Sequence, residues 1–160
     1  MEQNKRLRGL LTDKRMRRKF KANKKVRNAT TKVYKGIKFR SKLELFTYKK
    51  LEAVGIKCDY EKHKYILMPG FHFKSKSIEP NKRKGYIENI SKVRDITYTP
   101  DFVDLNEKWI IEVKGYANDV FPIKWKLFKN YLQQLKNPPV LFLPKNQKQV
   151  LETIQLIKQL

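Results

Sequence analysis

The chain has 160 residues, 38 of them Lys or Arg and only 15 Asp or Glu, which gives a formal charge of +23. A charge of this size predicts a polyanionic partner, with nucleic acid the expected one; the alternative is a charge excess kept for solubility. The single cysteine, Cys58, excludes an internal disulfide and a cysteine-rich zinc site, and the lack of an apolar run of membrane-spanning length leads us to expect a reducing, cytoplasmic compartment.

Residues 1–32 form a distinct basic segment. They hold thirteen Lys or Arg residues against two acids, Glu2 and Asp13, with too few apolar residues for a core. We expect an arm that is disordered, or helical only when bound, and that contacts phosphates; the alternative is a passive, solubilising tail. Its candidate nucleic-acid-binding residues are Arg15, Arg17, Arg18 and Lys19. The remaining residues, 33–160, are expected to form one domain, which is also basic.

The first part of this domain predicts a hairpin, a helix and a strand. Gly36 is suited to the hairpin turn, Ser41 to the start of the helix, and Gly55 to its end. The next segment combines prolines and glycines with many lysines, which favours turns and short strands. In chain order we expect a hairpin over 32–39, a helix over 41–54, a strand over 56–68 and short strands at 71–73 and 86–90.

The second part predicts two longer strands followed by alternating helices and a strand. A turn at Asn106-Glu107 joins the two strands, and Pro122 is suited to the first turn of a helix. We expect strands at 93–104, 108–114 and 140–143, and helices at 122–135 and 147–160. The order of helix, several strands, helix, strand and helix predicts an α+β fold.

Charged residues interrupt the two longer strands at corresponding places. Side chains alternate along a strand, so Glu112 and Lys114 share one face while Ile111 and Val113 share the other. If the strands form a simple hairpin, Asp101 lies across from Glu112, and two neighbouring carboxylates repel unless a cation or a proton lies between them. Mg²⁺ is typically held by one or two carboxylates, water and substrate phosphate. The alternative is an ordinary Glu–Lys pair on a solvated face.

Two further charged residues fall on the apolar faces of the predicted helices. Glu44 lies near the centre of the buried arc of the first helix, and we expect it to point at the sheet and join the site. It also completes a capping box with Ser41, which is the structural alternative. Lys124 falls within the apolar arc of the second helix, where it needs an anion such as phosphate or the acid cluster, unless it is a snorkelling lysine.

These residues resemble a known family. The set of Glu44, Pro100-Asp101 and Glu112-Val113-Lys114 resembles the PD-(D/E)XK nuclease superfamily, which implies a restriction-endonuclease-like core with a mixed central sheet flanked by helices in the order α-β-β-β-α-β. Residues 39–44, 55–61 and 98–102 look like the bacteriophage endonuclease I family of four-way-junction resolvases. Residues 94–98 and 114–128 look like a related group of phage nucleases. The match covers about residues 33–143.

The resemblance implies hydrolysis of DNA phosphodiesters with Mg²⁺, for which Mn²⁺ would substitute, in a bacterial host cytoplasm. Asp101 and Glu112 would bind the metal together with the Val113 carbonyl, Lys114 would handle the attacking water, and Glu44 would complete the acidic site. Arg40 and Lys124 are further candidates for nucleic-acid contact. The segment 69–92 is longer than in the resolvases, and the basic arm is an addition. A homodimer is expected from junction resolution, which needs two active sites.

Two other functions compete with a junction-selective endonuclease. The first is transposase-like or restriction-type cleavage by the same fold, with the same acids and lysine. The second is a non-catalytic DNA-binding or packaging protein, which the charge alone would serve and which needs no acid cluster.

Overall fold

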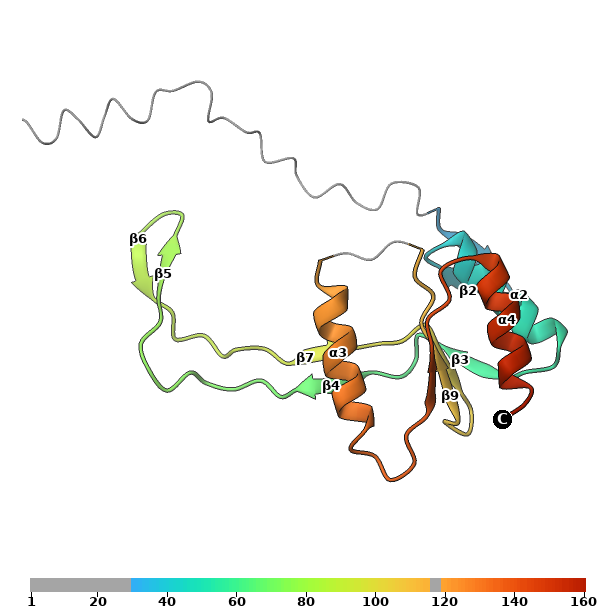
Figure 1. Cartoon of the computed structure of the whole chain (residues 1–160). Helices are drawn as coiled ribbons and strands as arrows, with labels where there is room; N and C mark the ends of the chain where they lie inside the picture. The colour runs from blue at the N-terminus through green and yellow to red at the C-terminus, as the bar shows by residue number, and fades with distance from the viewer. Residues whose placement is uncertain (1–29, 116–118) are drawn as a thin grey trace, which may run out of the picture.

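The computed structural model describes residues 30–115 and 119–160. Its centre is a four-stranded mixed sheet in the order β10-β9-β8-β3, whose neighbours are antiparallel except for the parallel pair β9 and β10. The strands are β3 (Cys58–Tyr60), β8 (Phe102–Asp104), β9 (Trp109–Ile111) and β10 (Val140–Phe142). Helices pack on both faces (Figure 1), so the predicted α+β class is confirmed.

Three helices are found in the described part of the chain. Helices α2 (Lys42–Ala53) and α4 (Gln147–Ile157) pack on each other and on one face of the sheet, and α3 (Phe121–Leu132) covers the other face. The side chains of Ser41 and Asn146 cap α2 and α4, since each accepts a hydrogen bond from a backbone N–H of the first turn. None of these helices is long and apolar enough to cross a membrane.

The alternation of the sheet residues divides the core in two. Trp109, Ile111 and Val113 pack beneath α2 and α4, whereas Ile110 and Val103 pack beneath α3. This is the division predicted from the period of two along residues 108–114. It leaves Glu112 on the α3 side of the sheet, where the apolar packing ends.

Two of the predicted strands are each divided. The strand expected over 56–68 breaks at Glu61, whose φ of +49° is left-handed, and continues as β4 (Tyr65–Met68). The strand expected over 93–104 consists of β7 (Ile96–Tyr98) and β8, separated at Pro100, which has no N–H to donate to a neighbouring strand. Strands β4 and β7 pair with each other, outside the central sheet.

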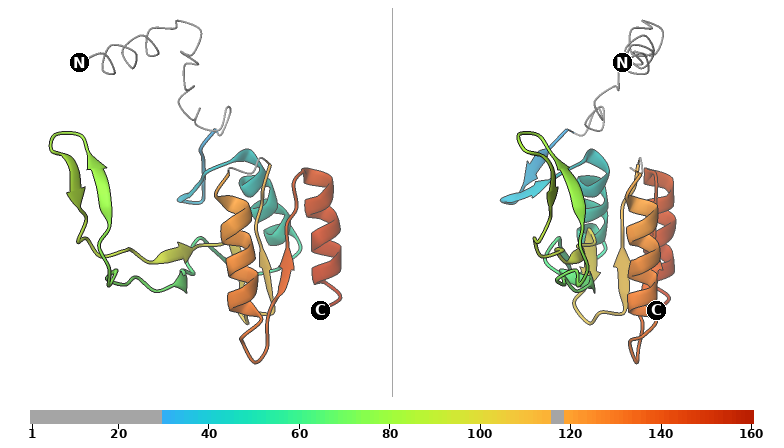
Figure 2. Two further views of the ribbon diagram at one scale, coloured as in Figure 1. Left: turned by 60° about the vertical axis from the view of Figure 1, so that its left-hand side comes forward. Right: turned by 90° about the vertical axis from the view of Figure 1, so that its left-hand side faces the viewer.

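Residues 65–98 form a two-stranded extension that we call the ribbon. It begins with the β4–β7 pair, continues through a bridge between Phe71 and Val93, and ends in the hairpin of β5 (Ile78–Asn81) and β6 (Gly85–Glu88). Figures 1 and 2 show it extending away from the helices. Of the short strands predicted here, 71–73 is only the bridge at Phe71 and 86–90 corresponds to β6; β5 was not predicted.

The N-terminal hairpin is confirmed. Strands β1 (Lys32–Tyr34) and β2 (Ile37–Phe39) are antiparallel, and the turn residues Lys35 and Gly36 both have positive φ, as a tight two-residue hairpin turn requires. Phe39 is fully buried and ties the hairpin to the core beneath α2. The predicted arm, residues 1–32, lies outside the described residues except for its last three.

Candidate active site

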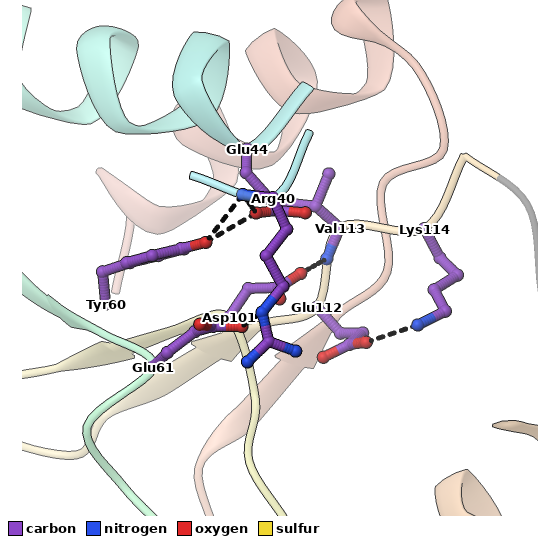
Figure 3. Close-up of polar contacts among 8 residues, drawn as sticks. All are labelled: Arg40, Glu44, Tyr60, Glu61, Asp101, Glu112, Val113 and Lys114. Atoms are coloured by element: carbon purple, nitrogen blue, oxygen red, sulfur yellow. Dashed lines mark hydrogen bonds and ion pairs between the residues drawn. The ribbon is translucent and has the colours of Figure 1, made fainter. Parts of the chain in front are cut away.

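The pairing of β8 with β9 brings the two predicted metal-binding acids together. Phe102 pairs with Ile111 and Val103 with Ile110, so one step further Asp101 lies across from Glu112. Both acids are buried, with 8% and 4% of their surfaces exposed. Asp101 Oδ2 accepts a hydrogen bond of 2.7 Å from the Val113 N–H (Figure 3). The expected juxtaposition is therefore present in the structure.

The two carboxylates favour protonation in this environment. Burial raises the pKa of Asp101 well above its ordinary value, and the nearby Glu112 and Glu44 carboxylates raise it further. Burial also raises the pKa of Glu112, although the Lys114 ammonium opposes the shift. Buried carboxylates with raised pKa values are characteristic of functional sites, because a bound cation would favour their charged form.

Lys114 lies on the same side of the sheet as Glu112. Its Nζ is 3.2 Å from Glu112 Oε1 and 4.5 Å from the centre of the Phe121 ring. The backbone around it is fixed by β10 and the residue that follows, because the Glu112 N–H donates to the Phe142 carbonyl and the Lys114 N–H to the Pro144 carbonyl. The Glu–Lys pair is thus part of a buried cluster, and the alternative of a fully solvated pair does not hold.

Glu44 points from α2 towards this cluster. It is 7% exposed, and its Oε2 accepts hydrogen bonds from the Tyr60 hydroxyl at 2.6 Å and the Arg40 N–H at 2.8 Å. Ser41 Oγ accepts from the Glu44 N–H at 3.1 Å, so the helix cap is also present. In a standard capping box the Glu44 carboxylate would accept a hydrogen bond from the Ser41 N–H, but here it accepts from the Arg40 N–H instead. Glu44 therefore helps to cap α2 and also lines the site.

The structure adds residues that the sequence did not suggest. Glu61 lies in the same pocket, pairs with Arg40 Nε at 2.9 Å, and donates its own N–H to the Asp101 carbonyl. Burial raises the pKa of Glu61, with Arg40 opposing and Glu44 adding to the shift. Burial and the bond to Glu44 likewise raise the pKa of Tyr60. Glu61 ends the stretch 55–61 that resembles the junction resolvases, but neither that resemblance nor its place in a strand-like stretch assigned it a role in the site.

These groups line one pocket of about 410 Å³. In Figure 3 the Arg40 side chain crosses in front of Glu61 and Asp101. Lys124 also lines the pocket, but its Nζ donates to the Thr97 carbonyl at 3.0 Å and forms no ion pair with the acids that the structure describes. The pocket is lined by Arg40, Glu44, Glu61, Thr97, Tyr98, Thr99, Asp101, Glu112, Val113, Lys114, Val120, Phe121 and Lys124.

The acids of the pocket provide as many carboxylates as a Mg²⁺ site usually has, but they do not form a complete set of protein ligands. In residues 30–115 and 119–160, no three His, Cys, Asp or Glu side chains are grouped closely enough to hold a metal ion. Mg²⁺, however, usually keeps several waters and takes only one or two protein carboxylates. Glu112 Oε2 and the Tyr98 hydroxyl are both buried, and neither makes a hydrogen bond of good geometry with those residues. The Tyr98 hydroxyl is nevertheless close enough to Glu112 to oppose the rise in its pKa. A buried carboxylate oxygen without a well-formed hydrogen bond requires an explanation, and a bound ion is one of those that apply.

The remaining predicted site residues have different outcomes. Arg15, Arg17, Arg18 and Lys19 lie outside the described residues. Arg40 reaches the pocket with a side chain that is 75% exposed, so it is accessible to a phosphate. Val113 lines the pocket and uses its N–H for Asp101; the metal-binding role of its carbonyl stays a prediction.

Comparison with known proteins gives a family but no function. A family model described as protein of unknown function (DUF1064) matches residues 17–147, and the chain belongs to that family. No curated protein and no solved structure matches the chain.

Proposed function

We propose that the protein is a metal-dependent endonuclease that hydrolyses DNA phosphodiester bonds. The observation that carries the proposal is the buried pair of Asp101 and Glu112, which lie opposite each other on β8 and β9 with Lys114 two residues further on. Burying two like charges is costly, and a fold that does so beside a lysine in an open pocket has a use for a divalent cation.

Seven residues of the pocket have a defined part in this proposal. Asp101 and Glu112 would hold Mg²⁺ or Mn²⁺, with the Val113 carbonyl as a further ligand, and the bound ion would supply positive charge to the phosphate undergoing attack. Lys114 orients the attacking water through its Nζ. Glu44 keeps Tyr60 in place and adds negative charge to the site. Arg40 and Lys124 bind phosphates of the substrate beside the one that is cut.

The reaction is a hydrolysis at phosphorus. The oxygen of water forms a bond to phosphorus while the bond to the 3′ oxygen breaks, which leaves a 5′-phosphate and a 3′-hydroxyl. Water loses one proton and the 3′ oxygen gains one, and both exchange with solvent because the pocket is open. Most of the catalysis is therefore positioning and electrostatic stabilisation of the transition state.

The charge of the chain agrees with a DNA substrate. A net +23 spread over both the N-terminal segment and the domain favours a long polyanion over a small phosphate ester. The resemblance to phage junction resolvases makes branched DNA the first substrate to test. On this proposal the protein would act as a homodimer within a bacterial host cytoplasm. Cleavage of the transposase or restriction type would use the same pocket.

A non-catalytic DNA-binding role is the second candidate, and the charge is the observation that favours it. It predicts binding without hydrolysis in either Mg²⁺ or Mn²⁺. It gives no reason for the buried acids, which destabilise the fold and contribute nothing to phosphate binding.

The test is a cleavage assay on three matched DNA substrates: a four-way junction, a nicked duplex and a linear duplex of the same sequence. We expect cleavage that requires Mg²⁺ or Mn²⁺ and stops with EDTA, with the junction cut fastest. Equal rates on all three would remove the junction preference and leave a general endonuclease. No cleavage of any substrate in either metal would overturn the proposal.

A further inference from the structure

The ribbon starts at the candidate active site. The Glu61 N–H, between β3 and β4, donates to the Asp101 carbonyl, between β7 and β8, at 2.9 Å and continues the pairing of β3 with β8 towards the ribbon. Thr97 and Tyr98 of β7 line the pocket, and the Tyr98 and Tyr65 rings pack on Phe128 of α3 at 4.6 and 5.0 Å. The base of the ribbon is therefore anchored to the core, and its direction is fixed relative to the site.

The outer part of the ribbon packs on nothing in the described chain. No residue from 69 to 95 is buried. Its apolar side chains are instead exposed, including Tyr86 at 75% and Ile90 at 83%. In the tip hairpin, Pro80 pairs with Tyr86 and Ile78 with Glu88, so Ile78, Pro80 and Tyr86 share one face by the alternation of strand residues. Exposed apolar groups gathered on one element indicate a surface that contacts a partner.

The charge of the ribbon identifies the kind of partner. It carries seven basic and three acidic residues, with Lys82-Arg83-Lys84 forming the turn at its tip. None of the seven basic side chains forms an ion pair with a residue that the structure describes. Two of the acids are already engaged, since Glu79 accepts from Ser77 and Asn89, and Asp95 accepts from the Gly70 N–H. The ribbon therefore presents unpaired positive charge.

We propose that the ribbon is a DNA-binding element that lies in a groove of the duplex flanking the candidate active site. The proposal takes its substrate from the proposed function and adds the element that holds the DNA. A two-stranded β-ribbon fits the major groove of B-DNA, which is about 12 Å wide. At ~3.3 Å per residue, the tip at Arg83 reaches at most about 45 Å from Thr97, on the order of one helical turn of DNA.

A second copy of the chain is the other possible occupant of this surface. It is less favoured, because a second copy carries the same +23 charge and would place basic ribbons against a basic surface. The test includes this outcome.

The test compares the DNA affinity of two triple variants of the full chain, without divalent metal so that no cleavage occurs. The first is Lys82→Ala, Arg83→Ala and Lys84→Ala at the tip. The control is Lys57→Ala, Lys108→Ala and Lys158→Ala, which removes the same charge from three exposed lysines that line a different pocket, away from the acids. Residues 1–29 are present in both, so their contribution to binding cancels.

We expect the tip variant to bind a 30-base-pair duplex at least tenfold more weakly than the control. The slope of log affinity against log salt should fall by up to about 2.7, or ~0.9 for each of the three phosphates that the tip would otherwise neutralise. Tyr86→Ala should further weaken binding by an amount that persists at high salt, since an apolar contact is not screened. All substituted side chains are exposed, and unchanged circular dichroism would verify the fold.

Equal affinities and slopes for the two triple variants would overturn the proposal. If the tip variant also changed from dimer to monomer in sedimentation while its DNA affinity stayed equal to the control, the ribbon would be a contact between copies. Failure of the proposed function is separable from both results, because it would appear as an absence of cleavage with metal, whatever the metal-free affinities.

Discussion

The acids of the candidate site lie where their negative charge is least favourable to the stability of the protein without a bound cation. Asp101 and Glu112 are nearly inaccessible to solvent and face each other, and Glu44 and Glu61 line the same pocket. Arg40 and Lys114 neutralise part of this charge, but Glu112 Oε2 makes no hydrogen bond of good geometry in the described part of the chain. Buried carboxylates with raised pKa values destabilise the folded state at neutral pH, so removing one should stabilise the protein without metal.

Asp101→Asn should stabilise the metal-free protein at pH 7.5, by on the order of 1 kcal/mol, or roughly 2–4 °C in melting temperature. Because the folded-state pKa of Asp101 is raised, the wild type loses stability as pH rises from the ordinary carboxyl value of about 3.9 through the raised one. The difference should therefore shrink towards pH 4. Asparagine can still accept the Val113 N–H, so the fold keeps that bond.

Melting curves from pH 4 to 8 without metal provide the measurement. The control is Asp104→Asn, a buried acid at the other end of β8 that accepts the N–H groups of Asn106 and Lys108 and should give no gain. Adding Mg²⁺ should raise the melting temperature of the wild type and leave Asp101→Asn unchanged. A variant less stable than the wild type at pH 7.5 would contradict this account of the site.

At the scale of elements, the sequence predicts what local spacing determines. Strand alternation placed Asp101 opposite Glu112, and the helical period placed Glu44 on the buried face of α2; the structure has both. The breaks in the strands at Glu61 and Pro100 were not predicted. The pattern of apolar residues shows neither a left-handed backbone conformation nor the lack of an N–H donor. Tyr60, Glu61 and Tyr98 were missed for another reason: they reach the site only through tertiary packing.

The two capped helices allow the position of Glu44 to be tested. Ser41→Ala and Asn146→Ala each remove a side chain that accepts a first-turn N–H, and each should cost about 1 kcal/mol of stability. Only α2 carries a residue of the site, so only Ser41→Ala should also slow DNA cleavage. Melting curves and single-turnover cleavage rates measure the two effects. Equal cleavage by both variants would show that the start of α2 does not position Glu44 for the reaction.

Across the whole molecule, four acids converge in one pocket while the basic residues are distributed widely. Residues 1–29 hold twelve Lys or Arg residues, the ribbon seven more, and Arg40 and Lys124 border the pocket itself. Under the proposed function, this division would separate DNA binding from chemistry. The charge outside the pocket would hold DNA by its phosphates at any sequence, and the small acidic pocket would act on one phosphate.

Deleting residues 1–29 should therefore weaken DNA binding far more than it slows the cleavage step. The salt slope should fall by ~0.9 for each phosphate that the segment neutralises in the full chain, while the single-turnover rate at saturating protein should stay within a few-fold of the full chain. Anisotropy titrations at several salt concentrations and single-turnover rates separate the two quantities. An unchanged affinity would mean that this segment does not contact DNA.

The most direct test of the central claim is cleavage of supercoiled plasmid in Mg²⁺ by the wild type, Asp101→Asn, Lys114→Ala and the control Asp59→Asn. Asp59 pairs with Lys62 and His63, and it does not line the pocket. We predict that the wild type and Asp59→Asn nick the plasmid, and that Asp101→Asn and Lys114→Ala are slower by roughly 10²-fold or more. Undiminished cleavage by both pocket variants would contradict the assignment of this site.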